Sequence, residues 1–238
     1  MIGGAARATD MEDNYEKLVR WYLRFNGYLT VENYVIHEAR NGRVPQGGEF
    51  DTVGVRFPYS REQIDQKLIR NDPKLQDAEP SARHLVDFVI AEVKGGKRNR
   101  LNSIWQPDNE DEKVRRVSYL LRWLGALNDE RSIREAACRL QKDHRARENG
   151  YLFRLVYFSH SKTKQAVPDI VPQITFREIA EFIVRLRTPC WHEFGMGVRS
   201  YHEQWDKLIR DIWDIGDPTK AAAEGERVER ILALLTDS

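Results

Sequence analysis

Three ionisable residues of the 238-residue sequence are notable for their types and their neighbours. Asp51 lies in an alternating apolar stretch, where a carboxylate is costly unless it is paired or binds a metal. Glu92 and Lys94 end the apolar run LVDFVIAEV, and two glycines follow directly. Such a set suits hydrolysis of a phosphodiester, because hard carboxylate oxygens hold Mg²⁺ while a lysine orients or deprotonates the attacking water.

Asp51 belongs to the second of two expected strands. The runs 34–39 and 49–57 are β-rich and separated by the loop NGRVPQGG, which predicts an antiparallel pair. The period of two places Asp51 on one face with Val53, Val55 and Phe57. The alternative is that Asp51 is simply a turn or strand-start residue.

Glu92 and Lys94 belong to the expected central strand, 85–93. Its nearly continuous apolar character is typical of a strand that is buried on both faces in the middle of a sheet. Glu92 and Lys94 share one face, so the pattern predicts a charged site at the carboxyl end of this strand. The alternative is a surface ion pair on an edge strand.

The other elements follow from periodicity and from helix-capping patterns. We expect a helix over 13–26 ended by Gly27, a short helix around 61–70, and two helices after the central strand. Further strands are expected over 151–158 and 173–176. Two helices should begin with the capping-box pairs Thr175/Glu178 and Ser200/Glu203, and a last helix should follow Gly216, Asp217 and Pro218. This order predicts an α/β fold with a central mixed β-sheet flanked by helices. The expected core covers 10–187 with an insertion at 58–83, and 188–238 forms a C-terminal helical extension packed on it.

Together, an Asp on one strand and Glu-Val-Lys on the next resemble the PD-(D/E)xK, or restriction-endonuclease-like, nuclease superfamily. The resemblance covers 13–187 at the level of element order. Phe50 stands where the family pattern has proline, and the gap of 92 − 51 = 41 residues is longer than in compact members, which the insertion explains. The glutamine-tyrosine motif of the RecB-like branch is absent.

That resemblance implies roles for individual residues. Asp51 and Glu92 would bind Mg²⁺ or Mn²⁺, the backbone carbonyl of Val93 would add a ligand, and Lys94 would act on the water. Glu16 on the first helix matches an acidic residue that many members place near the metal. The alternative for Glu16 is a helix-capping role, because Asp13 and Glu16 have capping-box spacing.

Charge is unevenly distributed although the formal net charge is only +1. Residues 94–147 hold 14 Lys or Arg against 8 Asp or Glu, whereas 203–238 hold 5 against 9. This distribution could orient a polyanion, or simply reflect solvated helix faces. Lys97, Arg98 and Arg100 directly follow the site, where they would contact phosphates or form a solvated turn.

No apolar run in the sequence is long enough for a membrane span or a signal peptide, so we expect a cytoplasmic protein without a membrane partner. Cys138 and Cys190 lack metal-ligand spacing and are expected to be buried free thiols. Trp191, Trp205 and Trp213 are expected in a C-terminal helical core.

The leading functional hypothesis is a metal-dependent endonuclease that cuts DNA, acting as a restriction or anti-phage defence effector. DNA is the expected nucleic-acid partner ahead of RNA, and a homodimer or a partner recognition subunit is the expected source of specificity. Two alternatives stay open. One is a catalytically silent nuclease fold kept for nucleic-acid binding or assembly, and the other is an RNA-cleaving effector with the same metal chemistry.

Overall fold

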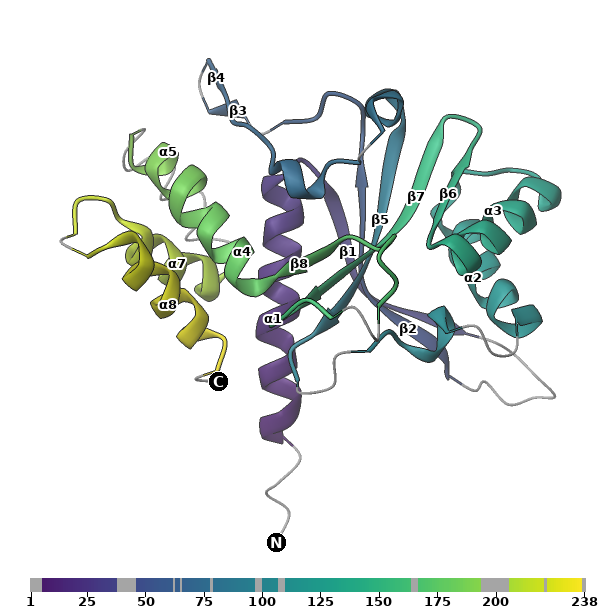
Figure 1. Cartoon of the computed structure of the whole chain (residues 1–238), viewed down its shortest axis with the longest axis horizontal. Coiled ribbons are helices and arrows are strands. Elements are labelled where there is room, and N and C mark those ends of the chain that lie inside the picture. Colours follow the sequence, from purple (N-terminus) through teal and green to yellow (C-terminus); the bar gives the residue numbers. More distant parts are fainter. Residues whose placement is uncertain are drawn as a thin grey trace, which may run out of the picture.

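The structure is a computed structural model that describes residues 6–37, 46–61, 63–64, 66–77, 79–96, 100–106, 110–163, 167–193, 206–220 and 222–236. Its centre is a mixed six-stranded β-sheet with helices on both faces (Figure 1), so the expected α/β class is confirmed. None of the described helices is long and apolar enough to cross a membrane.

The main sheet has the strand order β1-β2-β5-β7-β6, and β8 also pairs with β7. Its strands are β1 (Leu29–His37), β2 (Gln46–Arg56), β5 (Val86–Lys94), β6 (Arg145–Glu148), β7 (Tyr151–Ser159) and β8 (Gln173–Thr175). β1, β2 and β5 form an antiparallel meander, whereas β5 and β7 run parallel. β6 pairs with the first half of β7 and β8 with its second half. β5 is therefore a central strand, as its apolar run predicts.

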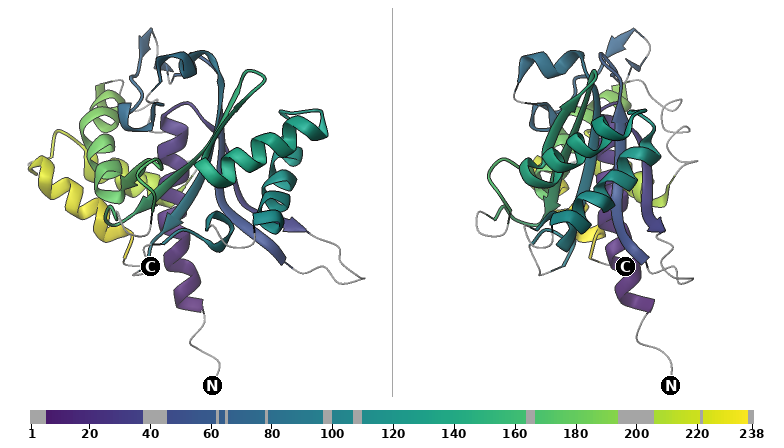
Figure 2. Two further views of the ribbon diagram at one scale, coloured as in Figure 1. Left: turned by 45° about the vertical axis from the view of Figure 1, so that its right-hand side comes forward. Right: turned by 90° about the vertical axis from the view of Figure 1, so that its right-hand side faces the viewer.

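Helices cover the two faces of the sheet unequally. α2 (Glu110–Leu124) and α3 (Glu130–Asp143) cover one face, and Figure 2 (right) looks onto them. The other face is covered by α1 (Ala6–Phe25) and, outside it, by α4 (Phe176–Phe182), α5 (Thr188–Glu193), α7 (Lys207–Gly216) and α8 (Glu224–Leu234). α1 starts earlier than the expected position 13, and it ends before Gly27, whose φ of +83° suits glycine.

Alternation along β5 divides the buried residues into two clusters. Val89, Ala91 and Val93 face α1 and join a cluster that continues into the C-terminal helices. Phe88 and Ile90 face α2 and α3. Glu92 follows Ile90 in this alternation, so it lies on the α2/α3 face.

The insertion at 58–83 is built differently from the expected short helix at 61–70, and that prediction is wrong. The segment instead contains the two-stranded pair β3 (Gln63–Ile64) and β4 (Lys67–Leu68). Leu68 is 56% exposed, and among the side chains that the structure describes in 61–70 only Ile69 is buried. A helix here would have no apolar face packed on the sheet to stabilise it.

Helix capping follows the sequence at one of the two expected positions. Thr175 and Glu178 form the predicted capping box at the start of α4. Ser200 and Glu203 lie outside the described residues, and α7 starts at Lys207, where the Asp206 side chain accepts a hydrogen bond from the Leu208 N–H.

The cysteine and tryptophan predictions have mixed outcomes. Both cysteines are free, but Cys138 is exposed and Cys190 half-buried, so the expectation of buried thiols is wrong. In α3 the two residues before Cys138, Ala136 and Ala137, face the core, and Cys138 itself points outward. Trp191 and Trp213 are buried and stacked with ring centroids 5.3 Å apart, whereas Trp205 lies outside the described residues.

Candidate functional site

The Asp51 side chain links β2 to the end of β5 by a hydrogen bond. The register between these strands ends with Thr52 opposite Ala91. One residue further on, Asp51 Oδ2 accepts a hydrogen bond of 2.6 Å from the Val93 N–H. The carboxylate therefore takes the place of a backbone partner where the two strands separate, and this fixes its position beside the Glu-Val-Lys segment.

Glu92 is a buried carboxylate with two close donors. It is only 3% exposed. Its Oε1 lies 2.7 Å from Lys94 Nζ and accepts a 2.9 Å hydrogen bond from the Asn102 N–H. Lys94 Nζ lies 4.0 Å from Asp51 Oδ2 as well. The structure thus brings together the three residues that the sequence singles out, with the lysine ammonium next to both carboxylates.

The environment of Glu92 favours its neutral form. Burial raises the pKa of Glu92, while the charge and hydrogen bond of Lys94 and the N–H of Asn102 act in the opposite direction. The net direction is upward. A buried carboxylate whose charge is incompletely compensated attracts a further cation, and such groups gather at functional sites.

Two aromatic residues that the sequence analysis missed also surround Glu92. Tyr157 of β7 is its neighbour in the parallel register, and burial together with the charge of Glu92 raises the pKa of Tyr157 to about 12. The Trp105 indole also faces this carboxylate and helps to lower its pKa, without a hydrogen bond of normal geometry. Among the described residues, the buried Tyr157 hydroxyl and Trp105 Nε1 have no hydrogen-bond partner.

The need for glycine at position 95 comes from its contact with α1. A Cβ at Gly95 would lie 2.3 Å from the Tyr15 ring of α1, whereas a Cβ at Gly96 meets nothing within 4 Å. His160 Nε2 also forms a 2.8 Å hydrogen bond with the Gly95 carbonyl. The first glycine after the strand therefore accommodates the helix, and only the second leaves open space.

Glu16 follows Tyr15 on α1, so it lies level with the carboxyl end of β5. It is half-buried. The alternative capping role shared with Asp13 is wrong, because α1 starts at Ala6 and Asp13 lies inside the helix. The role of Glu16 in the site stays a prediction.

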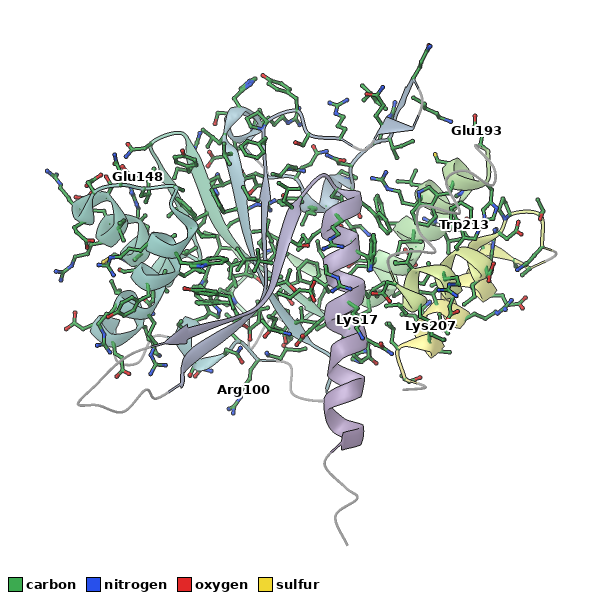
Figure 3. The ribbon with its side chains drawn as sticks, turned by 180° about the vertical axis from the view of Figure 1, so that it is seen from behind. Lys17, Arg100, Glu148, Glu193, Lys207 and Trp213 are labelled. Atoms are coloured by element: carbon green, nitrogen blue, oxygen red, sulfur yellow. The ribbon has the colours of Figure 1, made fainter. Side chains whose placement is uncertain are left out.

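The expected phosphate-contacting residues are only partly visible. Lys97 and Arg98 lie outside the described residues. Arg100 is exposed at the lower edge of the molecule in Figure 3, two residues before the Asn102 N–H that binds Glu92.

Asp51 and Glu92 would offer a metal ion two carboxylate groups. Within the described residues, no group of three or more His, Cys, Asp or Glu side chains gathers in a way that could hold an ion. Mg²⁺ is usually bound by one or two carboxylates and keeps several waters, so two carboxylates at a strand end fit Mg²⁺ or Mn²⁺. The expected carbonyl of Val93 belongs to the residue whose N–H already binds Asp51.

The alternative of a surface ion pair on an edge strand is wrong in two respects. Glu92 and Lys94 do form an ion pair, but their strand is central and the carboxylate is buried.

Comparisons of the chain with protein-family models, with curated proteins and with solved structures find no match.

Proposed function

We propose that the chain is a metal-dependent endonuclease that hydrolyses phosphodiester bonds of DNA through Asp51, Glu92 and Lys94. The observation that carries the proposal is the position of Lys94 Nζ, 2.7 Å from Glu92 and 4.0 Å from Asp51. An acidic strand and a Glu-x-Lys strand are neighbours in the sheet, which the PD-(D/E)xK resemblance requires. A role in restriction of foreign DNA or in anti-phage defence belongs to the same proposal.

In this proposal each residue has a task that fits its surroundings. Asp51, Glu92 and the Val93 carbonyl would hold Mg²⁺ or Mn²⁺, which when bound acts as a Lewis acid and lowers the pKa of water. Lys94 orients or deprotonates the attacking water and stabilises charge on the phosphate. The N–H groups of Val93 and Asn102 hold the two carboxylates in place, so that little reorganisation is needed on binding.

Cleavage assays with a lysine variant test the proposal. The purified chain is incubated with plasmid, single-stranded DNA and RNA in Mg²⁺, Mn²⁺ or EDTA. We expect cleavage of DNA that EDTA abolishes and that Lys94→Ala lowers by about 100-fold or more, as for loss of one transition-state contact. Lys142→Ala is the matched control, because Lys142 is an exposed lysine on α3, and it should cleave like wild type.

Equal cleavage by wild type and Lys94→Ala would show that the assigned centre is wrong. Cleavage of RNA alone would favour the RNA-cleaving effector, which uses the same residues.

A second candidate is a catalytically silent fold that binds nucleic acid or supports assembly. The observation that favours it is the ion pair itself, because Lys94 already neutralises part of the charge that a metal would meet. If wild type binds DNA but cleaves none of the substrates with either metal, this candidate replaces the endonuclease.

A further inference from the structure

A second candidate site lies at the end of the sheet opposite the carboxylates. A pocket of about 840 Å³ forms where β2 ends and β5 begins. Its walls come from 56–61, from residues 70, 71, 73, 76 and 77, from residues 80, 82–85 and 87, and from Leu152 and Leu186. Its volume falls within the range of small-molecule sites. Asp87 in its wall precedes Glu92 by five residues of β5, or about 16 Å of strand. In Figure 1 the neighbouring β3 and β4 stand at the upper end of the molecule, and in Figure 3 Arg100 lies at the lower end.

Four arginines line this pocket: Arg56, Arg61, Arg70 and Arg83. The last three residues are exposed, and within the described parts of the chain their guanidinium groups make no hydrogen bond or ion pair. Unpaired guanidinium groups that share one concave surface repel each other, and a bound anion would relieve that repulsion.

The acidic residues of the pocket wall do not cancel this charge. Asp87 is held by both arms of the buried Arg154, with contacts of 2.9 Å to each carboxylate oxygen. Asp77 forms a two-pronged contact with Arg145 at 2.9 and 3.0 Å. Each carboxylate is neutralised by an arginine that is not part of the wall, so the lining has an excess of positive charge.

Arg56 is a fixed cation in the wall, unlike the three exposed arginines. Its Nη2 donates to Asp87 Oδ2 at 3.0 Å, and its guanidinium lies 4.6 Å from the centroid of the Tyr28 ring. The side chain is 15% exposed. These contacts hold the guanidinium in one orientation before a ligand arrives, which lowers the entropy cost of binding.

Two aromatic rings stand among these arginines. Phe57 is 55% exposed and Tyr59 is 75% exposed. Tyr59 also has a φ of +68°, an unfavourable backbone conformation for a residue other than glycine, and its hydroxyl forms a 2.7 Å hydrogen bond with His84 Nδ1. Both exposed rings offer flat surfaces on which a planar ligand can stack, and the Tyr59 ring is also held in place by its hydrogen bond.

We propose that this pocket binds a nucleotide, with phosphate oxygens on the arginines and the base on Phe57 or Tyr59. Guanidinium groups match phosphate oxygens in pairs, and aromatic rings stack on bases of any sequence. A simple inorganic anion would not use the rings, and an acyl chain would not use the arginines. The ligand is a free nucleotide or a nucleotide of a single strand, and the site does not depend on the cleavage centre.

Calorimetric titration of the full chain in EDTA tests the proposal without any cleavage. The probes are ATP, pyrophosphate and a single-stranded oligonucleotide. We expect ATP to bind at one site per chain and more tightly than pyrophosphate. Arg61→Glu and Arg83→Glu should each weaken ATP binding by about tenfold or more. Arg134→Glu is the matched control, since Arg134 is an exposed arginine on α3 outside the pocket, and it should bind like wild type.

The other outcomes identify the ligand or contradict the proposed binding site. If the oligonucleotide binds more tightly than ATP and both pocket variants weaken it, the ligand is a strand. If ATP binds and the oligonucleotide does not displace it, the ligand is a free nucleotide. If neither ATP nor the oligonucleotide binds, or if neither pocket variant weakens their binding, the proposal is overturned. Equal affinity for ATP and pyrophosphate, with no effect of Tyr59→Ala, overturns the role of the rings.

Discussion

Two buried carboxylates on the same strand have opposite electrostatic environments. Burial alone would raise the pKa of Asp87, but the charge and hydrogen bonds of Arg154, with help from Arg56 and Tyr28, bring it below its ordinary value. The pKa of Glu92 is raised, because one lysine and one N–H do not offset its burial. Asp87 is thus an ionised carboxylate with a structural role, whereas the burial of the Glu92 carboxylate is only partly offset by its partners, which is typical of functional sites.

This difference predicts how stability depends on pH in the metal-free chain. The folded-state pKa of Glu92 lies above its ordinary value of 4.5, so the folded chain binds this proton more readily than the unfolded chain. The stabilisation of the folded chain by this proton is complete at pH values below the pKa that Glu92 has in the unfolded chain. It is lost as the pH rises through the pKa that Glu92 has in the folded chain. Glu92→Gln stays neutral, so its free energy of unfolding should rise relative to wild type as pH increases from about 4 to about 8.

Urea unfolding of both proteins in EDTA across this pH range measures the difference. A difference that does not change with pH would show that the pKa of Glu92 is not raised.

The site could be predicted from the sequence only where its signal is local. Asp51, Glu92 and Lys94 interrupt apolar strands, and such interruptions are visible in the sequence. Trp105 lies near Glu92 because it ends the short 3₁₀ helix Ser103–Trp105, and Tyr157 lies beside Glu92 in the parallel register of β5 and β7. That register depends on a connection of more than fifty residues, which local periodicity does not report.

At the scale of elements, the contact between α1 and β5 determines which glycine after the strand is essential. Gly95→Ala would push a methyl group into the Tyr15 ring, while Gly96→Ala has open space. We expect Gly95→Ala to lower the free energy of unfolding by about 1–3 kcal/mol, the usual cost of overpacking. Gly96→Ala is the matched control, and its effect should stay within about 0.5 kcal/mol.

Chemical denaturation of the two variants measures these costs. Equal stability of the two would mean that Tyr15 does not pack on Gly95 and that α1 is placed differently.

Elements with strong periodicity were predictable, and those without it were not. The buried runs that form β5 and β7 and the capping box of α4 have signals within a few residues. The β3 and β4 pair lacks such a signal, because each strand has only two residues and the Gln63, Lys67 and Leu68 side chains are exposed. Phe57 was expected on the buried face of β2, but it follows the strand end and joins the basic pocket.

At the scale of the whole molecule, the C-terminal helices share one core with α1 and the sheet. Trp191 and Trp213 belong to the same buried cluster as Val89 and Val93. A continuous helical run from α4 through Ile183–Arg187 to α5 crosses the expected boundary at 187/188. Shared burial of this kind favours cooperative unfolding of the whole chain.

Trp213→Ala tests this cooperativity. We expect a loss of about 3–5 kcal/mol in the free energy of unfolding, in a single transition by both circular dichroism and tryptophan fluorescence. Trp123→Ala is the control, because Trp123 is 44% exposed and stacks on Tyr34, so it should cost no more than about 1.5 kcal/mol. Two separate transitions in Trp213→Ala, with the first confined to the C-terminal helices, would mean that 188–238 is an independent unit.

The two ends of β5 differ in the charged side chains that surround them. Carboxylates gather where β5 ends, and unpaired arginines gather where it begins. A cation at one end and a nucleotide at the other would therefore bind without competing for the same residues. The two proposals can accordingly fail or succeed separately.

The most direct test of the central claim is Mn²⁺ binding, measured by electron paramagnetic resonance of the free ion, since it requires no knowledge of the substrate. We predict that wild type binds Mn²⁺ and that Asp51→Asn weakens binding by at least about tenfold. Asp111→Asn, which changes an exposed aspartate of α2, should bind like wild type. If wild type binds no Mn²⁺, or if Asp51→Asn binds it as tightly as wild type, Asp51 and Glu92 do not form a metal centre.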